Sequence, residues 1–140
     1  MMKDNRSHLL RIALLTDAGA SLICGGAALV LADPLTHWTG IASWILYALG
    51  VGLAIFAADV ALTATRDPIN RFFVKVIIAA NVAWVGGSVL VLLLYSDRLT
   101  MIGQLMVEVI AIFVATVTTV ETVGLKRLGG HTSSTKPRTA

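Results

Sequence analysis

Residues 72–95 form a long apolar run, FFVKVIIAANVAWVGGSVLVLLLY. Its only strongly polar side chains are Lys75, Asn81 and Ser88. A helix rises about 1.5 Å per residue, so a run of this length crosses a hydrocarbon core of about 30 Å. Backbone groups in lipid must bond within their own segment, which predicts a transmembrane helix.

Three further apolar runs of similar length accompany it, over residues 9–31, 41–64 and 101–125. The 140-residue chain is 56% hydrophobic and 14% charged, with a mean hydropathy of +0.83. Soluble domains carry about 25% charged residues, so a soluble chain of this composition could not cover its surface. The runs are separated by short polar breaks at Asp33-Pro34, Arg66-Asp67-Pro68 and Ser96-Asp97-Arg98. We therefore predict an all-α fold, a four-transmembrane-helix antiparallel bundle made of two hairpins.

The basic residues predict how this bundle is oriented. Arg98 is the single Lys or Arg in the first and third loops. The other ten lie at the chain ends or around the middle loop: Lys3, Arg6, Arg11, Arg66, Arg71, Lys75, Lys126, Arg127, Lys136 and Arg138. By the positive-inside rule both termini are cytoplasmic. This gives an N-terminal segment over 1–8, a transmembrane domain over 9–127 and a disordered tail over 128–140.

The first run has an alternative interpretation as a signal peptide cleaved at Val30-Leu31-Ala32. Its apolar stretch is longer than the usual length of about 7–15 residues, and Asp17 interrupts it. Both features favour a membrane helix.

The two hairpins also share a pattern at an offset of 64 residues. Asp33-Pro34-Leu35-Thr36 corresponds to Asp97-Arg98-Leu99-Thr100, and Asp17 corresponds to Asn81. These matches favour a parallel internal duplication with a pseudo-two-fold axis along the membrane normal. Chance similarity between two apolar hairpins is the alternative.

Polar side chains inside the spans form the candidate intramembrane site, since a central charge costs about 2.5–3.5 kcal/mol on insertion scales. The site comprises Asp17, Asn81, Asp59, Lys75 and Glu108. Asp17 and Asn81 fall at nearly the same depth, about 5 Å on the cytoplasmic side of the centre. One interpretation is a proton-accessible polar pocket that opens inward. The other is interhelical bonding, in which Asp17 bonds Asn81, Asp59 pairs with Lys75, and Lys75 and Glu121 extend to the interface.

Two further patterns predict helix contacts. A polar stripe over Gln104, Glu108, Ala115, Thr119 and Thr122 is expected to face the bundle or another protein, although threonines in helices often bond only their own i−4 carbonyl. Small residues, including Gly25-Gly26 and Gly86-Gly87-Ser88, are expected to mark packing faces.

The same sequence argues against several other functions. Its three histidines, His8, His37 and His131, lie outside the spans, so we expect no bis-histidine haem. Cys24 is the single cysteine, and no Cys or His cluster has metal spacing. No phosphate-binding loop or nucleophile–base pair appears. We expect no metal, no cofactor, no nucleic-acid partner and no enzymatic activity, except through the intramembrane carboxylates.

Three segments give the chain a family resemblance. They are Arg11…Asp17-Ala18…Ser21, Asn81…Trp84…Ser88 and Gly124-Leu125-Lys126-Arg127. In this pattern the chain resembles small bacterial four-helix membrane proteins of the DoxX-like kind and neighbouring families of unknown function. The resemblance implies a bacterial inner-membrane location and transfers no catalytic residue.

These observations leave two hypotheses for function. The first is a small accessory protein that acts through helix contacts with a second copy or with another membrane protein. The second is a proton-coupled carrier or binder of a small lipophilic molecule that uses the intramembrane carboxylates.

Overall fold

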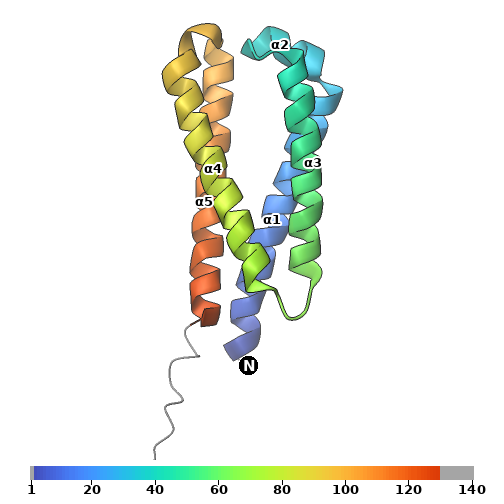
Figure 1. The fold of residues 1–140 in the computed structure, drawn as a ribbon, viewed down its shortest axis with the longest axis vertical. Coiled ribbons are helices and arrows are strands. Elements are labelled where there is room, and N and C mark those ends of the chain that lie inside the picture. The colour runs from blue at the N-terminus through green and yellow to red at the C-terminus, as the bar shows by residue number, and fades with distance from the viewer. Residues whose placement is uncertain (1, 130–140) are drawn as a thin grey trace, which may run out of the picture.

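A computed structural model describes residues 2–129, except for the side chains of residues 2–4 and 6. All regular structure in this range is helical: α1 Met2–Val30, α2 Ala32–Thr39, α3 Ser43–Thr65, α4 Arg71–Tyr95, the 3-10 helix η1 Ser96–Arg98, and α5 Met101–Gly129 (Figure 1). Four of these helices, α1, α3, α4 and α5, are long and apolar enough to cross a membrane. The all-α fold with four candidate spans is therefore confirmed.

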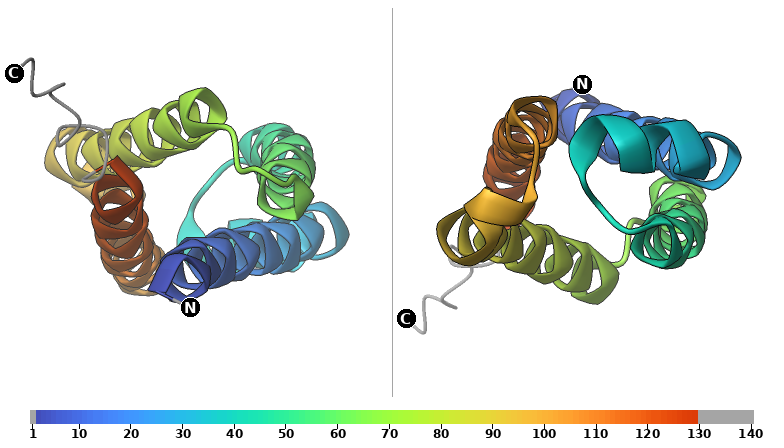
Figure 2. Two further views of the ribbon diagram at one scale, coloured as in Figure 1. Left: turned by 90° about the horizontal axis from the view of Figure 1, so that it is seen from below. Right: turned by 90° about the horizontal axis from the view of Figure 1, so that it is seen from above.

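The four long helices surround a common centre (Figure 2). α1 packs along α3 and also contacts α5, and α4 packs along α5. α3 and α4 make almost no contact with each other. The start of α1 and the end of α5 lie at one end of the bundle, which we call the terminal end, and α2 lies at the other, the α2 end (Figure 1).

The first loop differs from its prediction because it contains a helix, α2. Pro34 does stop the first long helix, which ends at Val30. Pro34 then occupies the first turn of α2, where backbone N–H groups have no intrahelical partner and a missing N–H costs nothing. The proline that ends one helix therefore begins the next.

Two of the long helices extend beyond their apolar runs at the terminal end. α1 begins at Met2, before the run over residues 9–31, and α5 continues through Gly129, past the run over residues 101–125. Arg71 Nη2 donates a hydrogen bond of 2.6 Å to the carbonyl of Leu128, which satisfies one of the free carbonyls at the end of α5. The rest of the predicted tail, residues 130–140, lies outside the described residues.

The hydrophobic core lies in the half of the bundle next to the terminal end. Its buried members come from α1, α3 and α4: Leu10, Leu14, Ala18, Val60, Ala64, Val74 and Ile77. α5 closes this core through Gly124, where an added Cβ would lie 3.2 Å from the Cβ of Leu10. Close approach at a small residue is the usual way for membrane helices to gain packing contacts.

The α2 end is held together by backbone contacts. The N–H of Thr100 donates to the carbonyl of Thr39 at 3.0 Å, and the Thr100 hydroxyl donates to the carbonyl of Trp38. Gly40 has φ +78°, and a Cβ there would clash with the carbonyl oxygen of Arg98. The two halves of the chain are therefore joined at this end, although α3 and α4 separate below it.

Candidate functional site

Three buried polar side chains from three helices meet inside the bundle. Asn81 on α4 donates from Nδ2 to Asp17 Oδ2 on α1 at 2.9 Å and to Glu121 Oε2 on α5 at 3.4 Å. Asp17, Asn81 and Glu121 are 2%, 4% and 0% exposed. We call these three residues the polar cluster. One amide group therefore connects two buried carboxyl groups from two other helices.

The polar cluster is short of positive charge. An asparagine amide has two N–H donors, and here they serve two carboxyl groups. The second oxygen of Glu121, Oε1, is buried and has no hydrogen-bond partner. Two ionised carboxylates in one buried site repel each other, and a neutral amide does not balance them. A proton or another cation bound at the polar cluster would relieve this repulsion.

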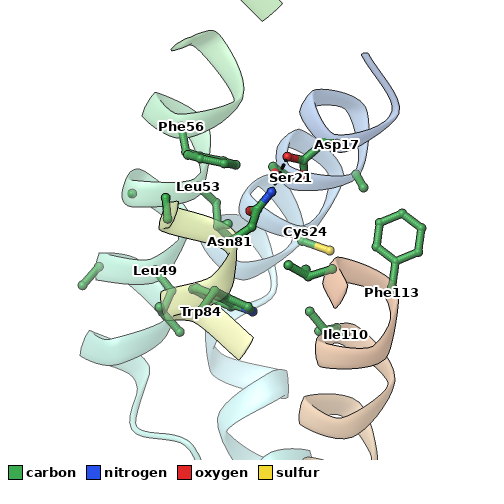
Figure 3. A pocket seen from close by; sticks show the side chains of 15 residues that line it. Asp17, Ser21, Cys24, Leu49, Leu53, Phe56, Asn81, Trp84, Ile110 and Phe113 are labelled. Carbon is green, nitrogen blue, oxygen red and sulfur yellow. Dashed lines mark hydrogen bonds between the residues drawn. The ribbon is translucent and has the colours of Figure 1, made fainter. Parts of the chain in front are cut away.

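A cavity of about 260 Å³ lies against the polar cluster (Figure 3). Asp17 and Asn81 stand at its wall, with Ser21 and Cys24 on the same helix as Asp17. The remaining lining is mostly apolar and comes from α3, α4 and α5, including Leu49, Phe56, Trp84, Ile110 and Phe113. The cavity thus combines a few polar side chains with an apolar, aromatic wall, which is the usual make-up of a small-molecule site.

A second, larger cavity of about 990 Å³ extends from the first toward the α2 end. Leu49, Ala80 and Trp84 line both cavities, so they stand where the two meet. The larger cavity lies between α3 and α4, the two helices that hardly touch, and Trp44 and Tyr95 also line it. The separation of α3 and α4 therefore leaves a continuous, mostly apolar space that runs from the α2 end, where Arg98 lines it, to the polar cluster.

The other predicted site residues do not join the cluster. Asp59 on α3, Lys75 on α4 and Glu108 on α5 are all exposed on the outside of the bundle. No ion pair joins Asp59 and Lys75 in the described part of the chain, so the expected pairing is not formed. Of the five predicted residues the structure brings together only Asp17 and Asn81.

Glu121 is the member of the cluster that sequence reasoning missed. Its position near the end of the fourth apolar run suggested a side chain that extends to the interface, but it faces inward and is fully buried. The helical spacing of Ala111, Val114, Thr118 and Glu121 would have placed it on the inner face of α5. The expected stripe through Glu108 lies beside this face, not on it.

The threonines of α5 and the small residues were also predicted to make helix contacts, and only some of the small residues do. Thr116, Thr118, Thr119 and Thr122 each donate to the carbonyl four residues earlier, as the alternative interpretation expected. Among the small residues, Gly25 does pack: an added Cβ would lie 3.0 Å from the carbonyl oxygen of Gly50 on α3. Gly26, Gly86 and Gly87 have nothing within 4 Å of such an atom, so they are not packing positions.

Within residues 2–129, no group of three or more His, Cys, Asp or Glu side chains is arranged to hold a metal ion. Comparison with known proteins adds no family: no family model, no curated protein and no solved structure matches this chain. The resemblance to DoxX-like proteins therefore stays a prediction, and the function has to be argued from the polar cluster and the two cavities.

Proposed function

We propose that this chain is a multi-pass membrane protein that binds or carries a small lipophilic molecule and couples this to protonation of the polar cluster. One observation carries the proposal: the buried carboxyl group of Asp17 lies at the wall of an otherwise apolar cavity. Carboxylates that served only to join helices would sit in a dry, filled interface. Here the carboxyl group of Asp17 borders space, and that space continues between α3 and α4.

The proposed orientation places the terminal end in the cytoplasm of a bacterial cell, with the protein in the inner membrane. Arg11, Arg66, Arg71, Lys126 and Arg127 lie toward the terminal end, and Arg98 lies in η1 at the other end. The larger cavity then opens toward the outer leaflet, and the polar cluster lies deeper, on the cytoplasmic side of it. A lipophilic molecule would enter sideways from the bilayer, between α3 and α4.

We also propose that the bundle consists of two antiparallel hairpins, α1–α3 and α4–α5, that arose by duplication. Asp17 and Asn81, which correspond at the offset of 64 residues, bond to each other across the bundle. Residues near a two-fold axis contact their own equivalents, so this bond supports the duplication. Its symmetry is imperfect, because α1 contacts α5 whereas the equivalent pair, α4 and α3, is nearly apart.

The experiment uses Cys24, the single cysteine of the chain, which lines the smaller cavity. Maleimides react with the thiolate, which forms only where water reaches the sulfur. We expect N-ethylmaleimide to label Cys24 in native membranes several-fold faster than a cysteine at the neighbouring lipid-facing position. That control is the Cys24→Ala chain with Ile23→Cys, because Ile23 is 74% exposed on the outer face of α1.

Two results are informative about this proposal. Faster labelling of Cys24 supports an accessible site beside Asp17. Equal, slow labelling at both positions would mean a dry interface, and the polar cluster would then be interhelical bonding alone. The Cys24→Ala chain without a second cysteine gives the background.

A second candidate function, an accessory protein acting through helix contacts, is favoured by one observation. Glu108 is exposed on α5 within its apolar span. A charge facing lipid costs about 2.5–3.5 kcal/mol on insertion scales, so a helix of a second copy or of another membrane protein would be favoured to cover it.

A further inference from the structure

We infer that the molecule bound in the smaller cavity is an organic cation, an ammonium group carried on an aromatic or branched apolar body, which exchanges with the proton of the polar cluster. This inference rests on the proposed function and names its ligand class. It follows from the balance of charge at the cluster and from the side chains on the facing wall.

The charge balance is set by the groups that face Asp17 from each helix around it. α4 contributes the neutral amide of Asn81, and α5 contributes a second carboxyl group, Glu121. α1 itself adds Ser21 and Cys24, and the α3 lining of the cavity has no titratable side chain. The charged residues nearest in sequence to these, Asp59 on α3 and Lys75 on α4, are exposed on the outside.

The basic residues of the helices have other positions and partners. Arg11, on α1, donates from Nη2 to the carbonyl of Arg66 at the terminal end. Arg71 donates to the carbonyl of Leu128. The cluster therefore has two carboxyl groups and no cation of its own within the described residues. A ligand with an anionic group would be repelled, and a ligand cation would supply the missing charge.

The apolar wall of the cavity suits a cation better than it suits a neutral polar group. Trp84 on α4, Phe56 on α3 and Phe113 on α5 border the same space as Asp17 (Figure 3). The faces of aromatic rings attract ammonium groups, most strongly where water is excluded. A neutral polar ligand would find few partners on this wall, since the N–H donors of Asn81 already serve the two carboxyl groups and Ser21 is the other uncharged polar side chain, apart from the thiol of Cys24, in the lining.

The exchange conserves charge. In the absence of ligand one proton is held between Asp17 and Glu121, which gives the unpartnered oxygen of Glu121 a donor. When a monovalent organic cation enters beside Asp17, the carboxyl group that borders the cavity, that proton leaves and the cation balances the charge that the proton had balanced. No bond other than the O–H bond is broken. Binding should therefore weaken as the pH falls, because protons compete for the same site.

The test compares two probes of nearly the same shape. Benzyltrimethylammonium carries a permanent charge at every pH, and neopentylbenzene has carbon in place of its nitrogen. We expect benzyltrimethylammonium to protect Cys24 from N-ethylmaleimide at concentrations at least about tenfold lower than neopentylbenzene, a factor that corresponds to 1.4 kcal/mol. Adding the cation to purified protein in weak buffer should also release protons.

Variants locate the effect. Asp17→Asn should weaken protection by the cation about tenfold or more and should abolish proton release. Glu121→Gln provides a second variant if the first does not fold. Asp59→Asn is the matched control, since Asp59 is exposed and outside the cavity, and it should change neither measurement.

The outcomes separate this inference from the proposed function. If both probes protect Cys24 equally, or only neopentylbenzene protects it, the cavity binds lipophilic molecules but the inference of a cation is wrong. If neither protects a Cys24 that maleimide reaches, the inference is also wrong. If maleimide does not reach Cys24, the proposed function fails with it.

Discussion

The two halves of this bundle are built differently, although the same helices run through both. Near the terminal end, α1, α3, α4 and α5 enclose a core that includes Leu10, Leu14 and Val74, all fully buried. Toward the α2 end, α3 and α4 separate and two cavities replace the core. The polar cluster of Asp17, Asn81 and Glu121 lies between the packed half and the open half.

This difference shows how the bundle keeps a cavity beside the polar cluster. Stability comes from the packed half, where side chains interdigitate. The open half keeps its shape because the backbone joins Thr39 to Thr100 at the α2 end and because α1 and α3 touch at Gly25 and Gly50. The open half can therefore leave space unfilled without losing the fold, and the polar cluster closes the lower end of that space.

The largest effect is expected from a cavity created in the packed half. Leu14→Ala removes a fully buried side chain on α1, and losses of about 2–5 kcal/mol are typical of such changes. The free energy of unfolding would be measured in mild detergent by thermal or denaturant unfolding. Leu22→Ala on the same helix is the control, because Leu22 is 59% exposed and lipid or detergent can replace its contacts. Equal losses for the two variants would contradict the placement of the core.

The sequence predicts the four spans well and the polar cluster only in part, because hydropathy and the depth of polar residues carry different information. Hydropathy found the four spans because each is long enough to cross a bilayer by itself. The polar residues Asp17 and Asn81 could be matched because both are strongly polar and lie at one depth. Glu121 was missed because depth alone does not say whether a side chain near the end of a span turns inward or toward the interface; its helical spacing from Ala111 and Thr118 carries that information.

The glycines show the same limit for packing. A small residue permits close approach, but only the three-dimensional arrangement says which face meets another helix. Gly25 meets Gly50, whereas Gly86 and Gly87 face open space and Gly87 lines the larger cavity. Pro34 likewise predicted a helix end correctly, but it did not indicate that a second helix, α2, begins two residues before it, at Ala32.

A smaller effect should distinguish the side of α3 that packs against α1, at Gly50, from the side that faces the smaller cavity, at Gly52. Gly50→Leu places a Cβ 2.9 Å from the carbonyl oxygen of Gly25, a backbone atom that cannot move aside alone. We expect this variant to lose about 1–3 kcal/mol of stability, the usual cost of overpacking. Gly52→Leu, two residues along the same helix, meets nothing within 4 Å and lines the smaller cavity.

Gly52→Leu should therefore keep its stability while it shortens the space beside Asp17. Its effect should appear instead as slower maleimide labelling of Cys24, measured as for the unchanged chain. If Gly52→Leu unfolded the protein as readily as Gly50→Leu, the cavity would have to be filled in the folded protein, and the contrast between the two sides of α3 would disappear.

The smallest effect on stability is expected from a change at Glu108. This variant is compared with the same change at Glu121, a buried carboxyl group on the same helix. Glu108→Gln should change the free energy of unfolding in detergent by no more than about 0.5 kcal/mol, because Glu108 is exposed in the folded chain and stays exposed to detergent when the helices separate. Its informative measurement is the fraction of chain captured in cross-linked complexes in the cell membrane. If Glu108→Gln abolishes a complex that Glu121→Gln leaves intact, the outer face of α5 is an interface and the accessory function gains support. If the two variants leave cross-linking unchanged and only Glu121→Gln alters proton release, the protein acts through the open half, and the exposed Glu108 is no part of it.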